Sequence, residues 1–223
     1  DGTWSVNTGS ATPASGSLSL NVNGNNSVSV TATDAAGNVS SAGTQTLVID
    51  STAPTVAITD NNSGTANSDV TYTITFSEAV EGFTVDDVTV ANGTKGTFTQ
   101  ESSTVYTLVV TPNTNSTSAI TVDIAGNVAT DTAGTNNTAA SQSSQAVDTA
   151  APSTPTIASI TTPNSDNTPT ITVTAENGAT VKIFSNGDLL GTATNTSGTT
   201  QIMIAVQRTP SRRAAVLLME TTA

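Results

Sequence analysis

The side chains that could do chemistry in this chain are almost all oxygen donors. The 223 residues include no Cys and no His, 17 Asp and Glu, and only 5 Lys and Arg, for a formal net charge of −12 at pH 7. Without thiol or imidazole groups, the composition excludes disulfides, Cys- or His-dependent nucleophiles and Cys/His zinc sites. Carboxylate, amide and carbonyl oxygens suit a hard cation, and Ca²⁺ is the cofactor that they indicate.

Candidate Ca²⁺ ligands gather where repeated segments end. Segments 34–38 and 123–127 both read Asp-x-Ala-Gly-Asn, and each precedes a Pro-containing linker, 49–54 or 147–152, whose Asp residues lie 98 residues apart. If the last loops of a β-sandwich share a pole with the outgoing linker, each turn meets the start of the next module. The predicted ligands are Asp34, Asn38, Asp50 and Asp60 at one joint, and Asp123, Asn127, Asp148 and Asp166 at the other.

These acidic segments also have a structural interpretation. Ala-Gly-Asn can be a turn that needs Gly at positive φ, with the Asp accepting backbone N–H bonds. Asp86-Asp87 with Glu78 fits a solvated strand edge better than a metal site, because adjacent strand residues face opposite ways. The pair Glu78 and Glu81 comes with no aromatic-lined cleft of the kind a glycosidase needs, and we expect no enzyme activity.

The elements that position these residues are predicted to be short antiparallel strands. Apolar residues alternate with Thr over 70–76, and similar period-2 runs occupy 18–22, 28–32, 106–110, 120–124, 171–173 and 181–183. Such alternation is typical of strands with one buried face, and the β-branched Thr residues, 47 in all, favour extended backbone. Gly, Asn, Asp and Pro clusters between the runs favour tight turns. The predicted fold class is all-β.

The repeat sets the predicted domain organisation. A period near 98 residues matches the size of an immunoglobulin-like sandwich, about 100 residues, so we predict tandem immunoglobulin-like β-sandwich modules. Residues 51–148 form one complete module, 1–50 the C-terminal half of a module, and 149–200 the N-terminal half of another. The two flanks together would make about one module, as expected for a piece of a longer tandem array.

Residues 201–223 depart from this pattern. They contain three Arg, one Glu and both Met residues, but neither Asn nor Gly. One interpretation is an amphipathic helix over 214–219. The other is a reading-frame error, because a two-base shift permits a repeat-like sequence here; an out-of-frame tail is predicted not to pair with strands of the third module.

Several segments resemble a known family. Segments 168–182 and 186–191 look like the first half of a bacterial Ig-like repeat, and 76–80, 82–88 and 92–94 resemble the related repeats of large surface adhesins and biofilm-associated proteins of the RTX type. The resemblance covers residues 1–200. It implies an extracellular or cell-surface stalk that spaces an adhesive region from the bacterial cell, stiffened in several members by Ca²⁺ between modules.

The expected function is therefore that of a non-catalytic stalk segment. Its expected partners are neighbouring Ig-like modules of the same chain and host or biofilm surface components. Two basic residues among the first 200 cannot neutralise a nucleic-acid backbone, and no run approaches the about 20 apolar residues of a membrane span. The alternatives are an Ig-like module that binds a glycan or protein ligand, and a spacer attached to a secreted hydrolase.

Overall fold

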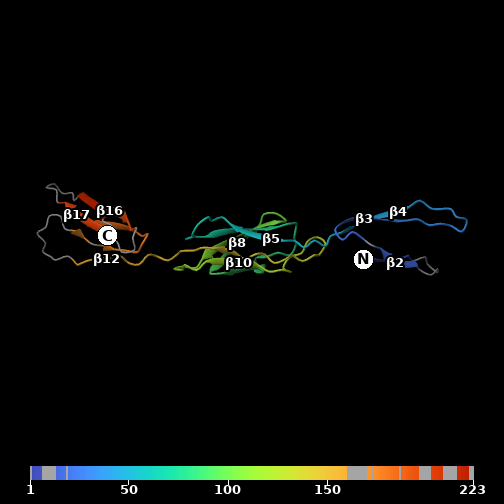
Figure 1. The fold of residues 1–223 in the computed structure, drawn as a ribbon, viewed down its shortest axis with the longest axis horizontal. Helices are drawn as coiled ribbons and strands as arrows, with labels where there is room; N and C mark the ends of the chain where they lie inside the picture. The colour runs from blue at the N-terminus through green and yellow to red at the C-terminus, as the bar shows by residue number, and fades with distance from the viewer. Residues whose placement is uncertain are drawn as a thin grey trace. The chain divides into compact units, whose positions relative to one another are not determined.

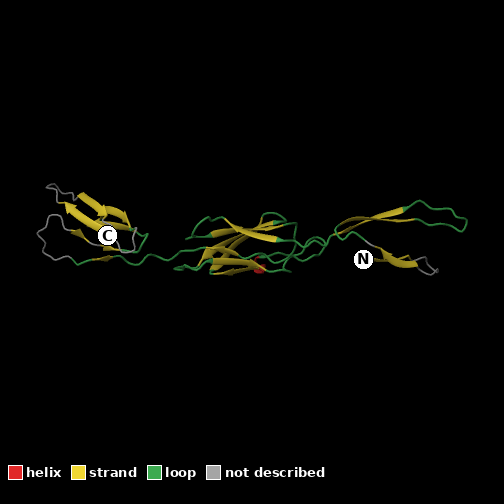
Figure 2. Cartoon of the chain, in the orientation of Figure 1, coloured by secondary structure: helices red, strands yellow, loops and turns green. Residues whose placement is uncertain are grey.

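The chain divides into two compact units of β-structure, Asp1–Ala150 and Ala151–Ala223. The computed structural model describes residues 2–6, 14–18, 20–159, 170–171, 173–185, 187–195, 202–207 and 215–220. Strands dominate both units, and the helical structure in these ranges is a single 3₁₀ turn, η1 (Val85–Asp87), drawn red in Figure 2. The all-β prediction is confirmed. Within the described ranges, no helix has the length and apolar character needed to cross a bilayer.

Residues 51–148, here called the central module, form an antiparallel sandwich of two sheets. The strand orders are β5-β6-β9-β8 and β11-β10-β7, and Figure 1 shows β5 and β8 in one layer with β10 in the other. The order brings together strands that are distant in sequence, β6 with β9 and β7 with β10, as Ig-like sandwiches do. The bounds are β5 Val56–Asp60, β6 Val70–Phe76, β7 Val88–Ala91, β8 Gly93–Gln100, β9 Val105–Pro112, β10 Ile120–Ile124 and β11 Ser143–Gln145.

The period-2 alternation of the sequence is the pattern that this sandwich buries. Along β6, Val70, Tyr72, Ile74 and Phe76 lie in the core, whereas the Thr residues between them are more exposed. Strands β9 and β10 alternate in the same way and close the core from both sheets. Burial of these apolar faces supplies the main free energy of folding. The remaining core residues of these two strands are Tyr106, Leu108, Val110, Ile120, Val122 and Ile124.

Four of the seven aromatic residues of the chain pack together at one end of this core. The rings of Phe76 and Phe83 lie edge to face with centroids 5.0 Å apart, as do those of Phe83 and Tyr106. Phe98 stacks on Tyr106 at 5.8 Å. Each such pair contributes about 0.5–1.5 kcal/mol beyond the area it buries, so these aromatics serve packing rather than surface recognition.

Two hairpins precede the central module: β1 (Gly2–Val6) with β2 (Ala14–Leu18), and β3 (Gly24–Val30) with β4 (Gly43–Ile49). The β3–β4 hairpin repeats the β10–β11 pair of the central module. Beyond β3, Thr33 forms an isolated β-bridge with Val39. Beyond β10, Thr130 forms the same kind of bridge with Asn136, and each of these two residues follows its counterpart by 97 positions. The repeat is thus structural as well as sequential.

The unit Ala151–Ala223 repeats the first strands of the central module. Ile157 pairs with Val173 as Ile58 pairs with Ile74, 99 residues earlier on both strands. The sheets are β12-β14, β13-β17-β18 and β15-β16. The bounds are β12 Thr156–Ile157, β13 Thr170–Ile171, β14 Val173–Thr174, β15 Thr180–Ser185, β16 Asp188–Thr194, β17 Ile202–Gln207 and β18 Ala215–Glu220.

The tail differs from both expectations for it. A strand, β18, occupies the region where an amphipathic helix is one prediction, and β17 pairs with β13 although an out-of-frame tail is predicted not to pair with this module. The run Ile202–Gln207 is rich in β-branched and apolar residues, and ladder bonds join backbone groups that every sequence carries. Strand pairing therefore does not test the reading frame, and the frameshift stays a prediction.

The inward assignment of β9 can be tested with neighbouring residues. Leu108→Ala removes a fully buried side chain and should lower the free energy of unfolding by about 2–5 kcal/mol. Val109→Ala, one position along on the opposite face, should cost clearly less, about 1 kcal/mol or below. Urea denaturation of both variants measures the difference, and equal losses would contradict the assignment.

Candidate cation site at a module joint

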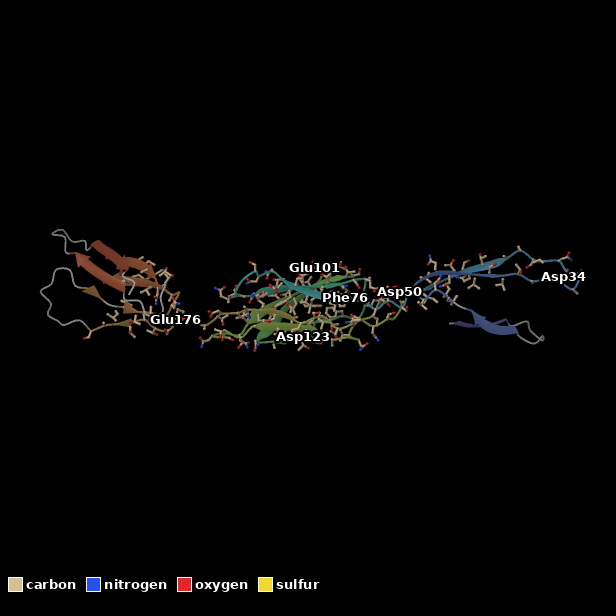
Figure 3. The ribbon with its side chains drawn as sticks, in the orientation of Figure 1. Asp34, Asp50, Phe76, Glu101, Asp123 and Glu176 are labelled. Carbon is tan, nitrogen blue, oxygen red and sulfur yellow. The ribbon has the colours of Figure 1, made fainter. Side chains whose placement is uncertain are left out.

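Three carboxylates converge where the chain enters the central module. One oxygen each of Asp50, Glu78 and Asp131 lies within 4.8 Å of the others. Asp50 belongs to the linker that precedes β5, Glu78 follows β6, and Asp131 lies in a turn beyond β10; Figure 3 labels Asp50 at this end of the central module. Antiparallel pairing explains the meeting, because β5 begins beside the end of β6.

The Asp131 turn is held by its own backbone. Asp131 Oδ1 accepts the N–H groups of Ala133 and Thr135, both at 2.8 Å, and the Gly134 N–H donates to the Asp131 carbonyl at 3.1 Å. Gly134 has φ +88°, a conformation that favours glycine. The N–H of Thr135, with smaller contributions from its neighbours, holds the pKa of Asp131 below its usual range, because these bonds favour the charged form.

The second carboxylate oxygen of Asp131 is buried and unpaired. Asp131 is only 4% exposed, yet its Oδ2 accepts no hydrogen bond. Among the buried side-chain nitrogens and oxygens of the described ranges, only the Tyr72 hydroxyl shares this condition. A buried, charged oxygen without a hydrogen bond costs free energy, and Asp131 also has one carboxylate oxygen within 4.8 Å of an oxygen of Asp50 and of Glu78. A group of oxygens of this kind suits a hard cation such as Ca²⁺.

The pKa of Glu78 reflects the same group of carboxylates. Its burial raises the pKa of Glu78 above the ordinary value, and the negative charges of Asp50 and Asp131 raise it further. The ionised native state therefore contains three like charges in a small, partly buried volume. A divalent cation would reverse the sign of these interactions.

A buried amide organises the loop after Asp131, and the backbone of that loop bonds to the linker. Asn137 Oδ1 accepts the N–H groups of Val128 and Ala129 at 2.9 Å, and its Nδ2 donates to the carbonyls of Ala125 and Thr138. The neighbouring Thr138 N–H donates to the Pro54 carbonyl at 2.9 Å. The linker that carries Asp50 is thus anchored to the loop that follows Asp131.

Asp34 and Asn38 are not brought to Asp50. The two ends of the antiparallel β3–β4 hairpin separate them, with Asp34 beyond the end of β3 and Asp50 after the end of β4 (Figure 3). Asp34 accepts the N–H groups of Ala36 and Asn38 and the side-chain amide of Asn38, at 2.8–2.9 Å. These are the bonds of the turn interpretation, and the Asn38 amide, with its neighbours, lowers the pKa of Asp34.

The second predicted set is also dispersed. Asp123 lies on β10 and accepts a bond from Gln142 Nε2 at 2.7 Å, whereas Asp148 follows β11 at the other end of the same ladder. Asn127 occupies a positive-φ turn position. Asp60 ends β5, at the pole away from Asp50, and Asp166 lies outside the described residues.

The sequence analysis predicts that each Asp-containing turn lies beside the linker that leaves its module, and this prediction is wrong for the central module. In the antiparallel β10–β11 pair, the chain leaves β11 beside the start of β10, while the turn follows the end of β10. The Asp-containing turn therefore meets the linker that enters its own module, not the linker that leaves it. Asp50 lies on a linker, as the sequence indicates, and the carboxylates near it are those of Glu78 and Asp131.

Sequence reasoning missed Asp131 and set Glu78 in another group. A signal was present: segment 131–135 (Asp-Thr-Ala-Gly-Thr) follows segment 34–38 by 97 residues, close to the period of 98, whereas Asp123 follows Asp34 by 89. Both turns have the same backbone bonds and the same positive-φ Gly. Asp86 and Asp87 lie in η1 rather than on a strand edge, and Asp87 accepts bonds from Thr84.

The two-sheet order and the length of the central module invite comparison with known families. Residues 50–147 match the family model of the bacterial Ig-like domain. Over these residues the chain is similar to the bacterial Ig-like domain. The match includes the linker Asp50 as well as Glu78 and Asp131, so all three carboxylates belong to the family's extent in this chain. No curated protein matches the chain.

Charge crowding in the central module can be tested without any cation. In EDTA at pH 7, Glu78→Gln should raise the melting temperature, because it removes a negative charge facing Asp50 and Asp131. The raised pKa of Glu78 means that its ionisation costs stability above that pKa, so the gain should shrink as the pH falls towards 4.5.

The matched control for this test is Glu81→Gln, an exposed carboxylate in the same loop. It should change the melting temperature little at either pH. A gain of equal size in the control would show that net charge, not the cluster, sets the effect.

Proposed function

We propose that this chain is a non-catalytic spacer segment of a bacterial cell-surface or secreted adhesin, and that Asp50, Glu78 and Asp131 bind Ca²⁺ at a module joint. The observation that supports the cation most directly is the buried, unpaired Asp131 Oδ2 beside two other carboxylates. Its partners in this role are the neighbouring modules of the same chain, with host or biofilm surface components bound elsewhere in the adhesin.

The residues present fit a hard cation. Their ligand atoms are oxygens only, which favours Ca²⁺ over metals that prefer nitrogen or sulfur. Three carboxylates would supply part of the 6–8 oxygens that Ca²⁺ takes, and backbone carbonyls and water commonly supply the remainder. Asp50 lies on the exposed linker and Asp131 within the module, so a shared cation would fasten one to the other.

Hydrogen bonds around the linkers support a spacer role independently of the cation. Pro54 is fully buried, and its fixed φ limits the linker. On the other side, the Ser51 N–H donates to Asn23 Oδ1 at 2.8 Å and its hydroxyl to the Val22 carbonyl at 3.1 Å. A joint bonded on both sides has few free torsions, which a stalk needs to keep its reach.

The following linker repeats these bonds at its start. The Thr149 N–H donates to the Ser116 carbonyl at 2.9 Å, and its hydroxyl donates to the Asn113 carbonyl at 2.6 Å. The N–H groups of Thr52 and Ala150 bond to Asp50 and Asp148 respectively, at equivalent positions of the repeat. Repeated joints of one design favour a tandem stalk over an isolated binding module.

The proposed site predicts Ca²⁺-dependent stability. A ligand that binds only the folded state adds about 2.7 kcal/mol at a hundredfold excess over its dissociation constant, so millimolar Ca²⁺ should raise the melting temperature relative to EDTA. Asp131→Asn should remove most of this rise, because it neutralises the buried ligand. X-ray scattering should show a narrower range of maximum dimensions in Ca²⁺ than in EDTA.

The control is Asp123→Asn, a residue of the dispersed set, which should keep the full Ca²⁺ response. Identical melting curves of the unmodified chain in EDTA and in Ca²⁺ would overturn the cation site. A response lost in Asp123→Asn but kept in Asp131→Asn would assign the cation to the sequence-predicted ligands instead.

A further inference from the structure

The last strand of the central module is short, yet the chain is firmly held where it leaves this strand. β11 has three cross-strand pairs with β10, whereas β5, the first strand of the module, has five with β6. The chain then continues through residues 145–149, which we call the exit segment. At its start the buried Gln145 side chain donates from Nε2 to the Gly64 carbonyl, in the loop between β5 and β6.

Ala66, in the same loop, holds one side of the exit segment. It forms an isolated parallel bridge with Val147. The Ala66 N–H donates to the Ala146 carbonyl, and the Asp148 N–H donates to the Ala66 carbonyl, both at 2.9 Å. Ala66 and Val147 both belong to the buried core, so the bridge is shielded from water and its loss would leave buried backbone groups without partners.

Thr149 fastens the other end of the exit segment to the loop between β9 and β10. Its N–H donates to the Ser116 carbonyl at 2.9 Å, and its hydroxyl donates to the Asn113 carbonyl at 2.6 Å and accepts the Ser116 N–H at 3.0 Å. Ser51 precedes Thr149 by 98 residues, and its hydroxyl donates to the Val22 carbonyl at 3.1 Å. A hydroxyl that fastens the chain just beyond a last strand therefore occurs at both linkers.

The chain enters and leaves the central module at opposite poles. It enters β5 beside the end of β6, where Val56 pairs with Phe76, and it leaves past Ala66, in the loop that precedes the start of β6. Tension along the chain therefore pulls β5 and β11 lengthwise, in opposite directions. Because cross-strand bonds lie perpendicular to the strands, such a pull shears several bonds at once instead of opening them one after another.

We propose that the exit segment, bonded to Ala66 on one side and to Ser116 on the other, is a mechanical clamp that keeps the central module folded under tension. With three pairs against five, β11 without these bonds would be the weaker of the two terminal strands. The bonds of the exit segment to two different loops strengthen that end. The use of the clamp rests on the proposed spacer role, because a spacer transmits tension, but the clamp does not involve the cation site.

Constant-force optical tweezers measurements on the full chain in EDTA test the clamp. The sequence has no Cys, so one Cys added at each end attaches the handles specifically. Unfolding of the central module is recognised by its length, because about 90 released residues add about 300 Å. Ala66→Pro removes the N–H that donates to Ala146 and should shorten the lifetime of the folded module at a fixed force by at least about tenfold.

The matched control is Ala140→Pro, which removes an N–H that donates to the Ile124 carbonyl, also at 2.9 Å. Residue 140 precedes β11, so tension reaches this bond only after β11 has been released. The control should lower the free energy of unfolding in urea, as Ala66→Pro does, but keep the lifetime under force of the unmodified chain, because its bond is still intact when the clamp fails. Equal shortening of the lifetime by both variants would overturn the clamp.

Thr149→Val tests the other side of the clamp without a change of backbone. It removes the hydroxyl that donates to Asn113 and should shorten the lifetime under force by at least about threefold. Its control is Thr107→Val, which removes a hydroxyl that donates to Glu101 from β9 and should leave the lifetime unchanged. An unchanged lifetime in Thr149→Val would overturn the clamp, even where Ala66→Pro does not fold. The melting response to Ca²⁺ tests the cation site separately, since the lifetimes are measured in EDTA.

Discussion

Every sheet of this chain must bury one face, and little apolar material is available to do it. Hydrophobic residues are 35% of the sequence and aromatic residues 3%. The central module meets this constraint by placing two alternating sheets face to face, with Tyr72, Ile74 and Leu108 fully enclosed. Along β3–β4, Val30 and Leu47 are exposed instead.

Charge imposes a second constraint on the same framework. With 17 acidic and 5 basic side chains, few carboxylates of this chain can be neutralised by Lys or Arg. Where a turn supplies backbone N–H groups, these donate hydrogen bonds to the carboxylate instead, as they do to Asp34 and to one oxygen of Asp131. The other oxygen of Asp131 has no hydrogen-bond partner, and the carboxylates of Asp50 and Glu78 lie close to that of Asp131. Burial and like charge both disfavour the ionised form of Glu78 at this cluster.

The internal repeat makes one module a reference for the others. Equivalent bridges at Thr33 and Thr130, and equivalent pairs at Ile58 and Ile157, align the partial modules with the complete one. Ile58 packs against the core of the central module, whereas Ile157 at the equivalent position is 69% exposed.

Much of the fold could be predicted from the sequence, and the candidate site only in part. Local alternation over 70–76 and 120–124 determines which residues can form half-buried strands, because successive side chains of a strand point to opposite faces. The linker Asp50 and the turn chemistry of segment 34–38 are equally local.

Which strand ends share a pole is not local, because it depends on how β5, β6, β10 and β11 pair. That pairing brings Glu78 and Asp131 to Asp50 and separates Asp123 from Asp148. The tail shows the same division, since its composition does not tell a helix from a strand until β13 offers an edge to β17. Side-chain period is written residue by residue in the sequence, whereas a three-carboxylate cluster exists only once antiparallel ladders have placed distant strand ends side by side.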